Sequence, residues 1–218
     1  MKRNLKALLL AMMMVGALSV VGASSAQATN QFHCAVSNCT ITSTPDETAG
    51  TATAHHLFDV PNNGSITCNQ VDVTSTGNNA TQTTLTAGTV NYKECKWFGQ
   101  NATVKMNGCD YLFNASGGVT VGGVECAAKP IEFSIAGCVG KVGPQVLTGI
   151  KHHAGPLSGG KKTITIEAAV PGIKVAVSGA ACIVPGTYTT GQYTTGNTIL
   201  TGEEGGTLNM VDVSWTTT

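Results

Sequence analysis

The chain has 218 residues, with twelve Lys or Arg and twelve Asp or Glu, so its formal net charge at pH 7 is zero. Hydrophobic residues make up 42% of the chain, which is too many for a disordered protein. Arg3 is the only arginine, and a basic patch of the kind that binds DNA or RNA is missing, so the composition excludes nucleic acid as a partner.

The first 28 residues have the three-part layout of a secretory signal peptide. A basic start with Arg3 precedes an apolar run over residues 7–21, and Ala26-Gln27-Ala28 supplies a cleavage site. The apolar run is shorter than the ~20 residues that cross a bilayer. We therefore expect 1–28 to be cleaved, no membrane span, and a secreted mature chain. Its net charge would be −3, because three of the twelve basic residues and none of the twelve acidic residues leave with the signal.

The first strand signals of the mature chain change their alternation partway. In residues 66–73 and again in 85–92, two apolar positions on one face are followed by two positions that are out of phase with them. A phase change of one residue is what a β-bulge produces, and Gly88 in the second segment suits one.

Later segments alternate regularly between apolar and polar residues, which predicts strands with one buried face. They cover residues 130–137, 162–170, 172–179 and 211–215. Roughly a dozen short strands, separated by Gly, Pro and Asn turns, are typical of an antiparallel β-sandwich. We predict an all-β fold with one domain over 29–218, and two small β-domains split near 127–130 as the alternative.

A short repeat near the C-terminus is the most distinctive surface feature that the sequence predicts. Tyr188-Thr189-Thr190-Gly191 recurs after Gln192 as Tyr193-Thr194-Thr195-Gly196. If Thr190-Gly191 forms a two-residue hairpin loop, Tyr188 faces Tyr193 across the two strands. Such a pair either stiffens the hairpin or stacks on a sugar ring or a partner's side chain.

The mature chain contains eight cysteines, an even number that indicates four disulfides in an oxidising compartment. Eight cysteines allow 105 pairings, so spacing alone does not fix the connectivity. We predict pairing between neighbours, and a metal site built from cysteines is not expected. The predicted pairs are Cys34–Cys39, Cys68–Cys95, Cys109–Cys126 and Cys138–Cys182.

The cysteine framework and its surroundings resemble a group of uncharacterised exported proteins of actinobacteria. The segments 32–40, 95–99 and 106–113 carry the resemblance, together with the order of Cys109, Cys126 and Cys138 and the stretch from Gly172 to Cys182. The resemblance implies export and a shared disulfide-stapled β-rich fold, and it implies no activity.

Two motifs with potential chemistry have simpler structural explanations. Residues 155–163 approach the phosphate-binding pattern G-x-x-x-x-G-K-[ST], but Lys162 replaces the hydroxyl residue and a strand follows instead of a helix, which indicates a turn. The histidine pairs His55-His56 and His152-His153 are expected to be exposed near turns, with a weak zinc or copper site that adds Asp59 as the alternative. Adjacent residues of a strand point to opposite faces, so only one histidine of each pair could join such a site.

No catalytic, cofactor or metal residues are therefore predicted. The expected function is that of a non-catalytic structural or binding protein outside the cell, with cell-wall or carbohydrate contact. Alternatives are a carbohydrate or small-ligand-binding module that uses Tyr188 and Tyr193, and a secreted hydrolase with an unrecognised site. A deep pocket lined by histidines and carboxylates would favour the hydrolase, and a flat exposed aromatic patch would favour the carbohydrate-binding module.

Overall fold

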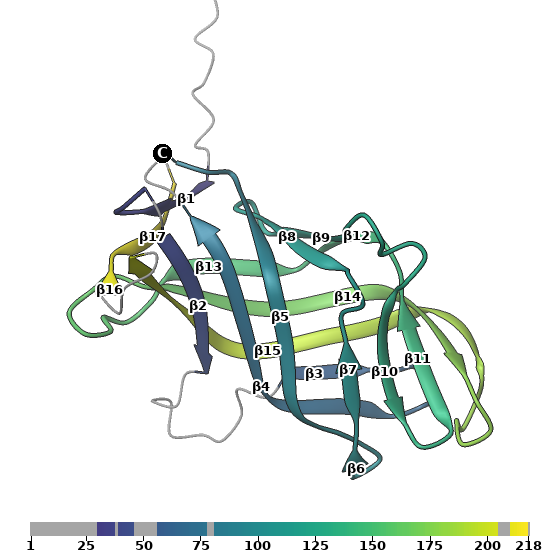
Figure 1. Cartoon of the computed structure of the whole chain (residues 1–218). Coiled ribbons are helices and arrows are strands. Elements are labelled where there is room, and N and C mark those ends of the chain that lie inside the picture. The colour runs from purple at the N-terminus through teal and green to yellow at the C-terminus, as the bar shows by residue number, and fades with distance from the viewer. Residues whose placement is uncertain (1–29, 38, 46–55, 78–80, 205–209, 218) are drawn as a thin grey trace, which may run out of the picture. The chain divides into compact units, whose positions relative to one another are not determined.

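β-Strands joined by turns make up the described part of the chain, which is residues 30–37, 39–45, 56–77, 81–204 and 210–217 of a computed structural model (Figure 1). The predicted signal peptide lies outside these residues. Within them no helix is present, and none that could cross a bilayer. Asn30–Thr217 form one compact unit. The predicted all-β class is confirmed.

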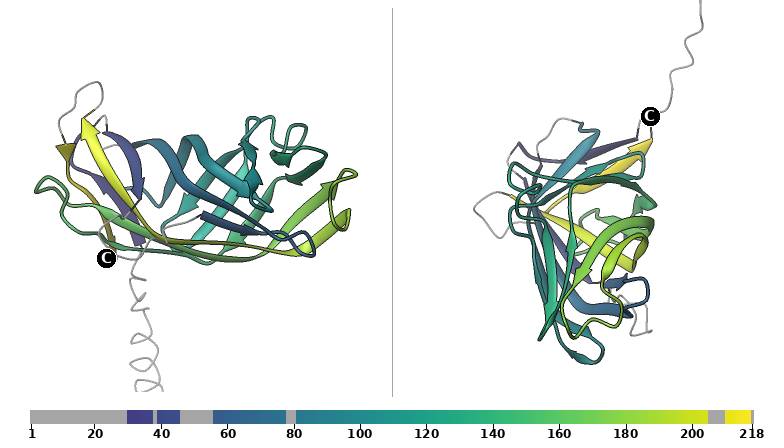
Figure 2. Two further views of the ribbon diagram at one scale, coloured as in Figure 1. Left: turned by 90° about the horizontal axis from the view of Figure 1, so that it is seen from below. Right: turned by 90° about the vertical axis from the view of Figure 1, so that its right-hand side faces the viewer.

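Four long strands form the frame of this unit. They are β4 (Ser65–Gly77), β5 (Thr84–Trp97), β14 (Ile164–Ser178) and β15 (Gly186–Glu204). Figure 2 shows β14 and β15, green to yellow, on one side of the interior and β4 and β5, blue, on the other. The sequence predicted short strands because it divided β14 at Pro171-Gly172, where the structure has register shifts within a single strand.

The remaining strands are shorter and complete the pairing along the frame. In the first half of the chain they are β1 (Asn30–Cys34), β2 (Cys39–Pro45), β3 (His56–Asp59), β6 (Gln100–Asn101), β7 (Thr103–Lys105), β8 (Asp110–Asn114) and β9 (Gly118–Gly122). In the second half they are β10 (Ile131–Ile135), β11 (Cys138–Val142), β12 (Gln145–Thr148), β13 (Ile150–Ala154), β16 (Met210–Val211) and β17 (Val213–Thr217).

Fifteen of the described strands belong to one sheet, and two distant parts of this sheet meet where β12 leads into β13 at Gly149. Its order runs β12-β9-β8-β5-β4-β2-β15-β14, and β13 pairs with β14. Gly149 joins β12 to β13, so the chain passes there from the edge of β9 to the edge of β14. The Gly149 carbonyl accepts a hydrogen bond from Ala169 N, and a Cβ on Gly149 would lie 2.1 Å from the Ala169 carbonyl oxygen. Only glycine allows this close crossing.

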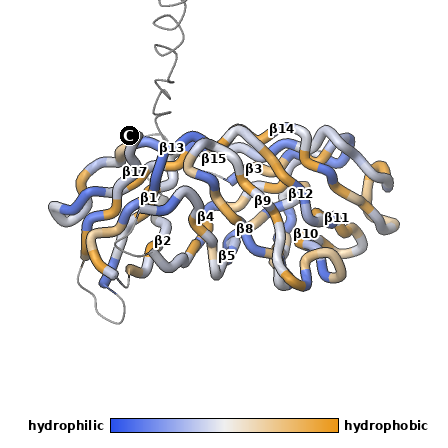
Figure 3. The backbone as a smooth tube through the Cα atoms, turned by 90° about the horizontal axis from the view of Figure 1, so that it is seen from above, coloured by the Kyte–Doolittle hydropathy of each residue, from blue (hydrophilic) through white to orange (hydrophobic). Residues whose placement is uncertain are grey.

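The order of the strands bears on two of the architectural predictions. The two-layer β-sandwich is not confirmed, because the layers in Figure 2 are connected through continuous strand pairing. The strands on either side of residues 127–130 also belong to the same sheet, since β9 is connected to β5 through β8, and β10 is connected to β14 through β11. Hydrophobic and hydrophilic residues alternate along these strands (Figure 3), so one face of the sheet encloses the core.

A separate two-stranded sheet of β1 and β17 lies at one end of the long strands (Figure 1). Phe32 of β1 exchanges backbone hydrogen bonds with Gln82, which precedes β5. Trp215 of β17 donates its ring N–H to the Ala115 carbonyl, at 3.1 Å. These bonds attach the terminal strands to the main sheet.

Four disulfides join the neighbouring cysteines, as predicted, and the described residues contain no free cysteine. Cys68 and Cys95 face each other directly across β4 and β5, with Cα atoms 3.9 Å apart. The bulge predicted at Gly88 is also confirmed, because the partner of Thr74 is Thr89 and the partner of Ser75 is Ala87. The phase change in residues 66–73 corresponds to no bulge between β4 and β5, because their partners stay in one register from Ile66 to Thr74.

Candidate functional site

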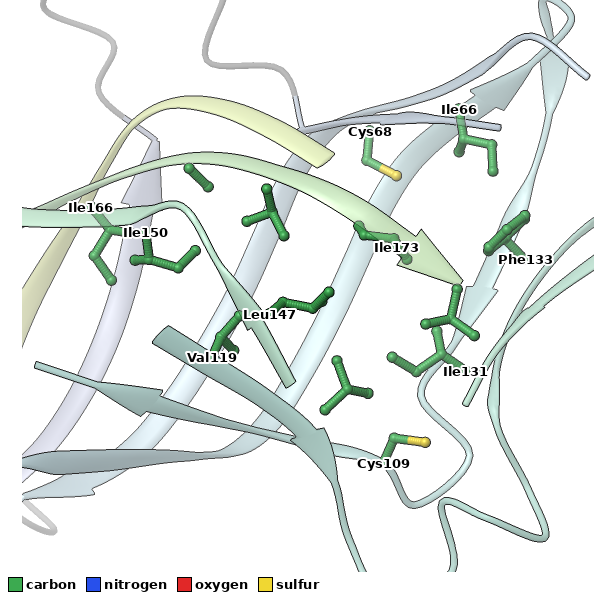
Figure 4. Close-up of a cluster of buried hydrophobic side chains, with 14 of the residues drawn as sticks. Ile66, Cys68, Cys109, Val119, Ile131, Phe133, Leu147, Ile150, Ile166 and Ile173 are labelled. Atoms are coloured by element: carbon green, nitrogen blue, oxygen red, sulfur yellow. The ribbon is translucent and has the colours of Figure 1, made fainter. Parts of the chain in front are cut away.

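An apolar cavity of about 150 Å³ lies in the interior between the long strands. Figure 4 shows Leu147, Val119, Ile150 and Ile173 projecting from different strands into this interior. Most of the lining residues are aliphatic or aromatic. Within the described residues, the lining contains no Asp, Glu, Lys or Arg.

Small side chains contribute to the free space. Ala87 of β5 and Ala168 of β14 both line the cavity, and both are almost fully buried. Larger aliphatic residues occupy inward positions of the same strands, for example Leu85 and Val170. Alternating strands therefore form a wall whose inward alanines leave a space that is not filled by neighbouring side chains.

A row of four polar rings interrupts this apolar lining. It consists of Tyr111 on β8, Tyr92 on β5, Tyr193 on β15 and His56 on β3, and we call it the tyrosine–histidine row. These strands are neighbours or next neighbours in the sheet, through β8–β5, β5–β4, β4–β3 and β3–β15. The sheet order thus brings together residues that are far apart in the sequence.

Hydrogen bonds connect the members of the row in sequence. The Tyr111 and Tyr92 hydroxyl oxygens are 3.1 Å apart, and a further hydrogen bond joins the hydroxyls of Tyr92 and Tyr193. The Tyr193 hydroxyl lies 2.5 Å from Nδ1 of His56. The His56 ring also stacks on Tyr193, with ring centres 6.1 Å apart. The polar atoms of the row are therefore satisfied largely by one another.

Burial keeps the three tyrosines of the row neutral. It raises the pKa of Tyr92, Tyr111 and Tyr193 well above the ordinary value of a phenol, because a phenolate would lose its hydration inside the protein. All three side chains are partly buried, and all three line the cavity. They can act there as neutral hydrogen-bond donors and acceptors.

A second buried histidine lies toward the end that carries β1 and β17. His152 of β13 is 6% exposed and packs between Phe32 and Trp215, with ring centres 5.0 and 6.4 Å away. Neither of its ring nitrogens has a hydrogen-bond partner among the described residues. Burial lowers the pKa of His152 to about 4, with a smaller contribution from the neighbouring His153. We call these three rings the end cluster.

The expectation that the paired histidines are exposed was therefore wrong for two of them. His56 and His152 are buried because each occupies an inward position of its strand. His153 points outward, as alternation predicts, and its Nε2 lies 3.8 Å from Glu167. His55 lies outside the described residues. In the described part, no three His, Cys, Asp or Glu residues converge as a metal site.

The predicted hairpin at Thr190-Gly191 was also wrong. β15 runs through this segment without a turn, so Tyr188 and Tyr193 lie on the same strand, opposite Val175 and Val170 of β14. Tyr193 lines the cavity, whereas the Tyr188 hydroxyl donates to the Val184 carbonyl at 2.6 Å. They do not form an exposed cross-strand pair. That either ring stacks on a ligand stays a prediction.

The Gly-rich segment 155–163 forms a turn, as predicted. Ser158 and Lys161 bond to each other through their backbones, and strand β14 begins directly afterwards at Ile164. A phosphate site of this type needs a helix at that place, so its geometry is missing. Among the features of the described chain, the cavity therefore has the geometry that most resembles a binding site.

Comparisons with protein-family models, with curated proteins and with solved structures found no significant match. The resemblance to exported actinobacterial proteins stays a prediction.

Sequence reasoning missed most of the tyrosine–histidine row. Tyr92 and Tyr111 were not singled out and lay only within the segments 85–92 and 106–113, and His56 was expected to be exposed. The sequence signal for these residues was a Tyr or His side chain at a position that alternation places on the inward face of a strand. Which of those rings meet depends on strand order, which alternation does not provide.

Proposed function

We propose that this protein is exported and binds one small, neutral, mainly apolar molecule in the cavity between its long strands, without transforming it. The observation that carries the proposal is the cavity of about 150 Å³, with its mainly apolar wall, its tyrosine–histidine row and a few hydroxyl side chains. A concave, mainly apolar space with a few convergent polar groups is typical of small-molecule sites.

The volume and the lining indicate the size and charge of the molecule. An apolar cavity of similar volume accommodates a benzene-sized molecule. An ion would lose its hydration there without gaining a counter-charge, since no charged side chain belongs to the described lining. A neutral ligand avoids that cost.

The polar groups of the cavity support binding over hydrolysis. Hydrolysis by a serine needs a free nucleophile beside a base and an orienting group. The Ser75 hydroxyl in the cavity wall donates to the Thr86 carbonyl, so it is not a free nucleophile. The four disulfides are compatible with an extracellular location, and export follows from the predicted signal peptide.

Filling the cavity tests this function. Ala168 and Ala169 are neighbours on β14, but Ala168 is buried and lines the cavity while Ala169 is exposed. We expect toluene to bind the wild-type protein saturably in calorimetry. Ala168→Leu should weaken this binding about tenfold or more, because the added carbons occupy the ligand's space.

Ala169→Leu is the matched control and should leave toluene affinity unchanged. Near-ultraviolet circular dichroism checks that both variants keep the wild-type fold. Equal affinities of the two leucine variants would place toluene outside the cavity. No saturable binding to wild type would disprove the proposed function and leave a structural role.

A further inference from the structure

Tyr111 is the free end of the tyrosine–histidine row. Tyr92 and Tyr193 each have a hydrogen-bond partner on both sides within the row, whereas the Tyr111 hydroxyl has only Tyr92 as a partner among the residues that the structure describes. A hydroxyl group can donate one hydrogen bond and accept two. Tyr111 therefore keeps unused hydrogen-bonding capacity at the wall of an apolar cavity.

The hydrogen bonds of the row can run in either of two directions. If Nδ1 of His56 accepts, each hydroxyl donates toward His56, and the Tyr111 oxygen is left as a hydrogen-bond acceptor. If Nδ1 carries a proton, each hydroxyl donates in the opposite direction, and the Tyr111 O–H is left as a donor. Both arrangements use neutral groups, and the His56 tautomer distinguishes them.

We propose that the Tyr111 hydroxyl binds the single oxygen of a neutral phenol, alcohol or ketone whose hydrocarbon body fills the apolar part of the cavity, an inference that rests on the proposed function. A ketone oxygen accepts from the donor form of Tyr111. A phenol or alcohol hydroxyl matches either form.

The surroundings of Tyr111 limit the ligand to this class. The side chains nearest to it along the strands that flank β8 are Ala87 and Val121, which offer no polar side-chain atom. A second polar group of the ligand close to Tyr111 would face these two aliphatic side chains without a partner, at a cost in affinity. A ligand with one oxygen on a hydrocarbon body places the oxygen at the Tyr111 hydroxyl and its carbon atoms against the aliphatic wall.

Phenol and toluene form a matched pair of probes, because they differ only by a hydroxyl in place of a methyl group. Tyr111→Phe removes the free hydroxyl and keeps the ring. We expect this variant to bind phenol about fivefold more weakly than wild type, which corresponds to one net hydrogen bond. Toluene should bind the variant as tightly as wild type, or more tightly.

Tyr188→Phe is the control variant, since its hydroxyl bonds to Val184 and does not line the cavity. It should change neither affinity. If both probes bind and Tyr111→Phe affects them equally, this inference is wrong and the proposed function stands. If neither probe binds wild type, both are wrong.

A spectroscopic measurement on the wild-type protein does not depend on the folding of any variant. The carbonyl stretching frequency of bound cyclohexanone should fall below its value in hexane, because a hydrogen bond weakens the C=O bond. A bound frequency equal to that in hexane would overturn the donor form of Tyr111 and the assignment of a ketone to it, and phenol binding then tests the acceptor form.

Discussion

The two buried histidines have opposite environments. His56 belongs to a connected row of polar rings at the cavity wall, and its Nδ1 lies 2.5 Å from the Tyr193 hydroxyl. His152 lies in the end cluster between Phe32 and Trp215, and both of its ring nitrogens lack a partner among the described residues. Both histidines are nearly inaccessible.

This difference indicates two separate tasks for similar side chains. A buried polar group without a partner costs free energy, so His152 contributes as a packed ring and lowers stability as a polar group. His56 is partnered and orients a row of hydroxyls toward a cavity. Variants of the end cluster should therefore change stability alone, while variants of the row should also change ligand affinity.

The largest effect is expected from Phe32→Ala. Phe32 is 2% exposed, and its removal leaves a cavity beside His152. The free energy of unfolding should fall by about 3–5 kcal/mol in urea titrations. Toluene affinity of the folded fraction should not change. A matching loss of toluene binding would show that the end cluster and the cavity are one site.

The next effect concerns the pH dependence of stability. His152 has a folded pKa of about 4 against an ordinary value of 6.5, so the unfolded chain binds a proton at this residue more readily. Protonation of this residue costs no stability well above pH 6.5, and about 3 kcal/mol of stability should be lost as pH falls from 6.5 to 4.

His152→Leu should remove this component of the pH profile and raise stability at pH 7 by about 1 kcal/mol, because an unpartnered polar ring is replaced by an apolar side chain. Urea titrations of wild type and variant at pH 7 and pH 4 measure both changes. Parallel profiles of the two proteins would contradict the account of His152.

A smaller loss is expected from Tyr193→Phe in the row. The change removes the hydrogen-bond partner of His56 Nδ1 and one partner of Tyr92. Stability should fall by about 1–2 kcal/mol, since buried polar atoms are left without partners. Tyr188→Phe removes an exposed hydroxyl and should lower stability by less. Thermal unfolding of the two variants measures this difference. A larger loss in Tyr188→Phe would argue against a buried row.

The smallest effect should come from His153→Ala, next to His152 on the same strand. The His153 and Glu167 side chains are each 44% exposed, and their closest atoms are 3.8 Å apart. An exposed pair of this kind contributes little, so stability at pH 6 should change by less than about 0.5 kcal/mol. A loss of stability comparable to that of Phe32→Ala would show that the exposed face of β13 contributes strongly to the stability of the fold.

The sequence by itself determined the all-β class, the bulge at Gly88 and the opposite faces of His152 and His153. These features follow from a local rule, because side chains alternate along a strand. The four disulfide pairs were predicted correctly, but cysteine spacing did not determine them, since eight cysteines allow 105 pairings.

Tertiary structure decided the course of β15 and the composition of the row. Thr190-Gly191 resembles a hairpin turn, but pairing with β14 continues past it, and a Cβ on Gly191 would lie 2.9 Å from the Ile173 carbonyl oxygen. Glycine is needed there for close approach between strands. His56 and Tyr193 meet although 137 residues separate them. Only the order of strands in the sheet brings such residues together, because local alternation fixes the face of a side chain and not its neighbours.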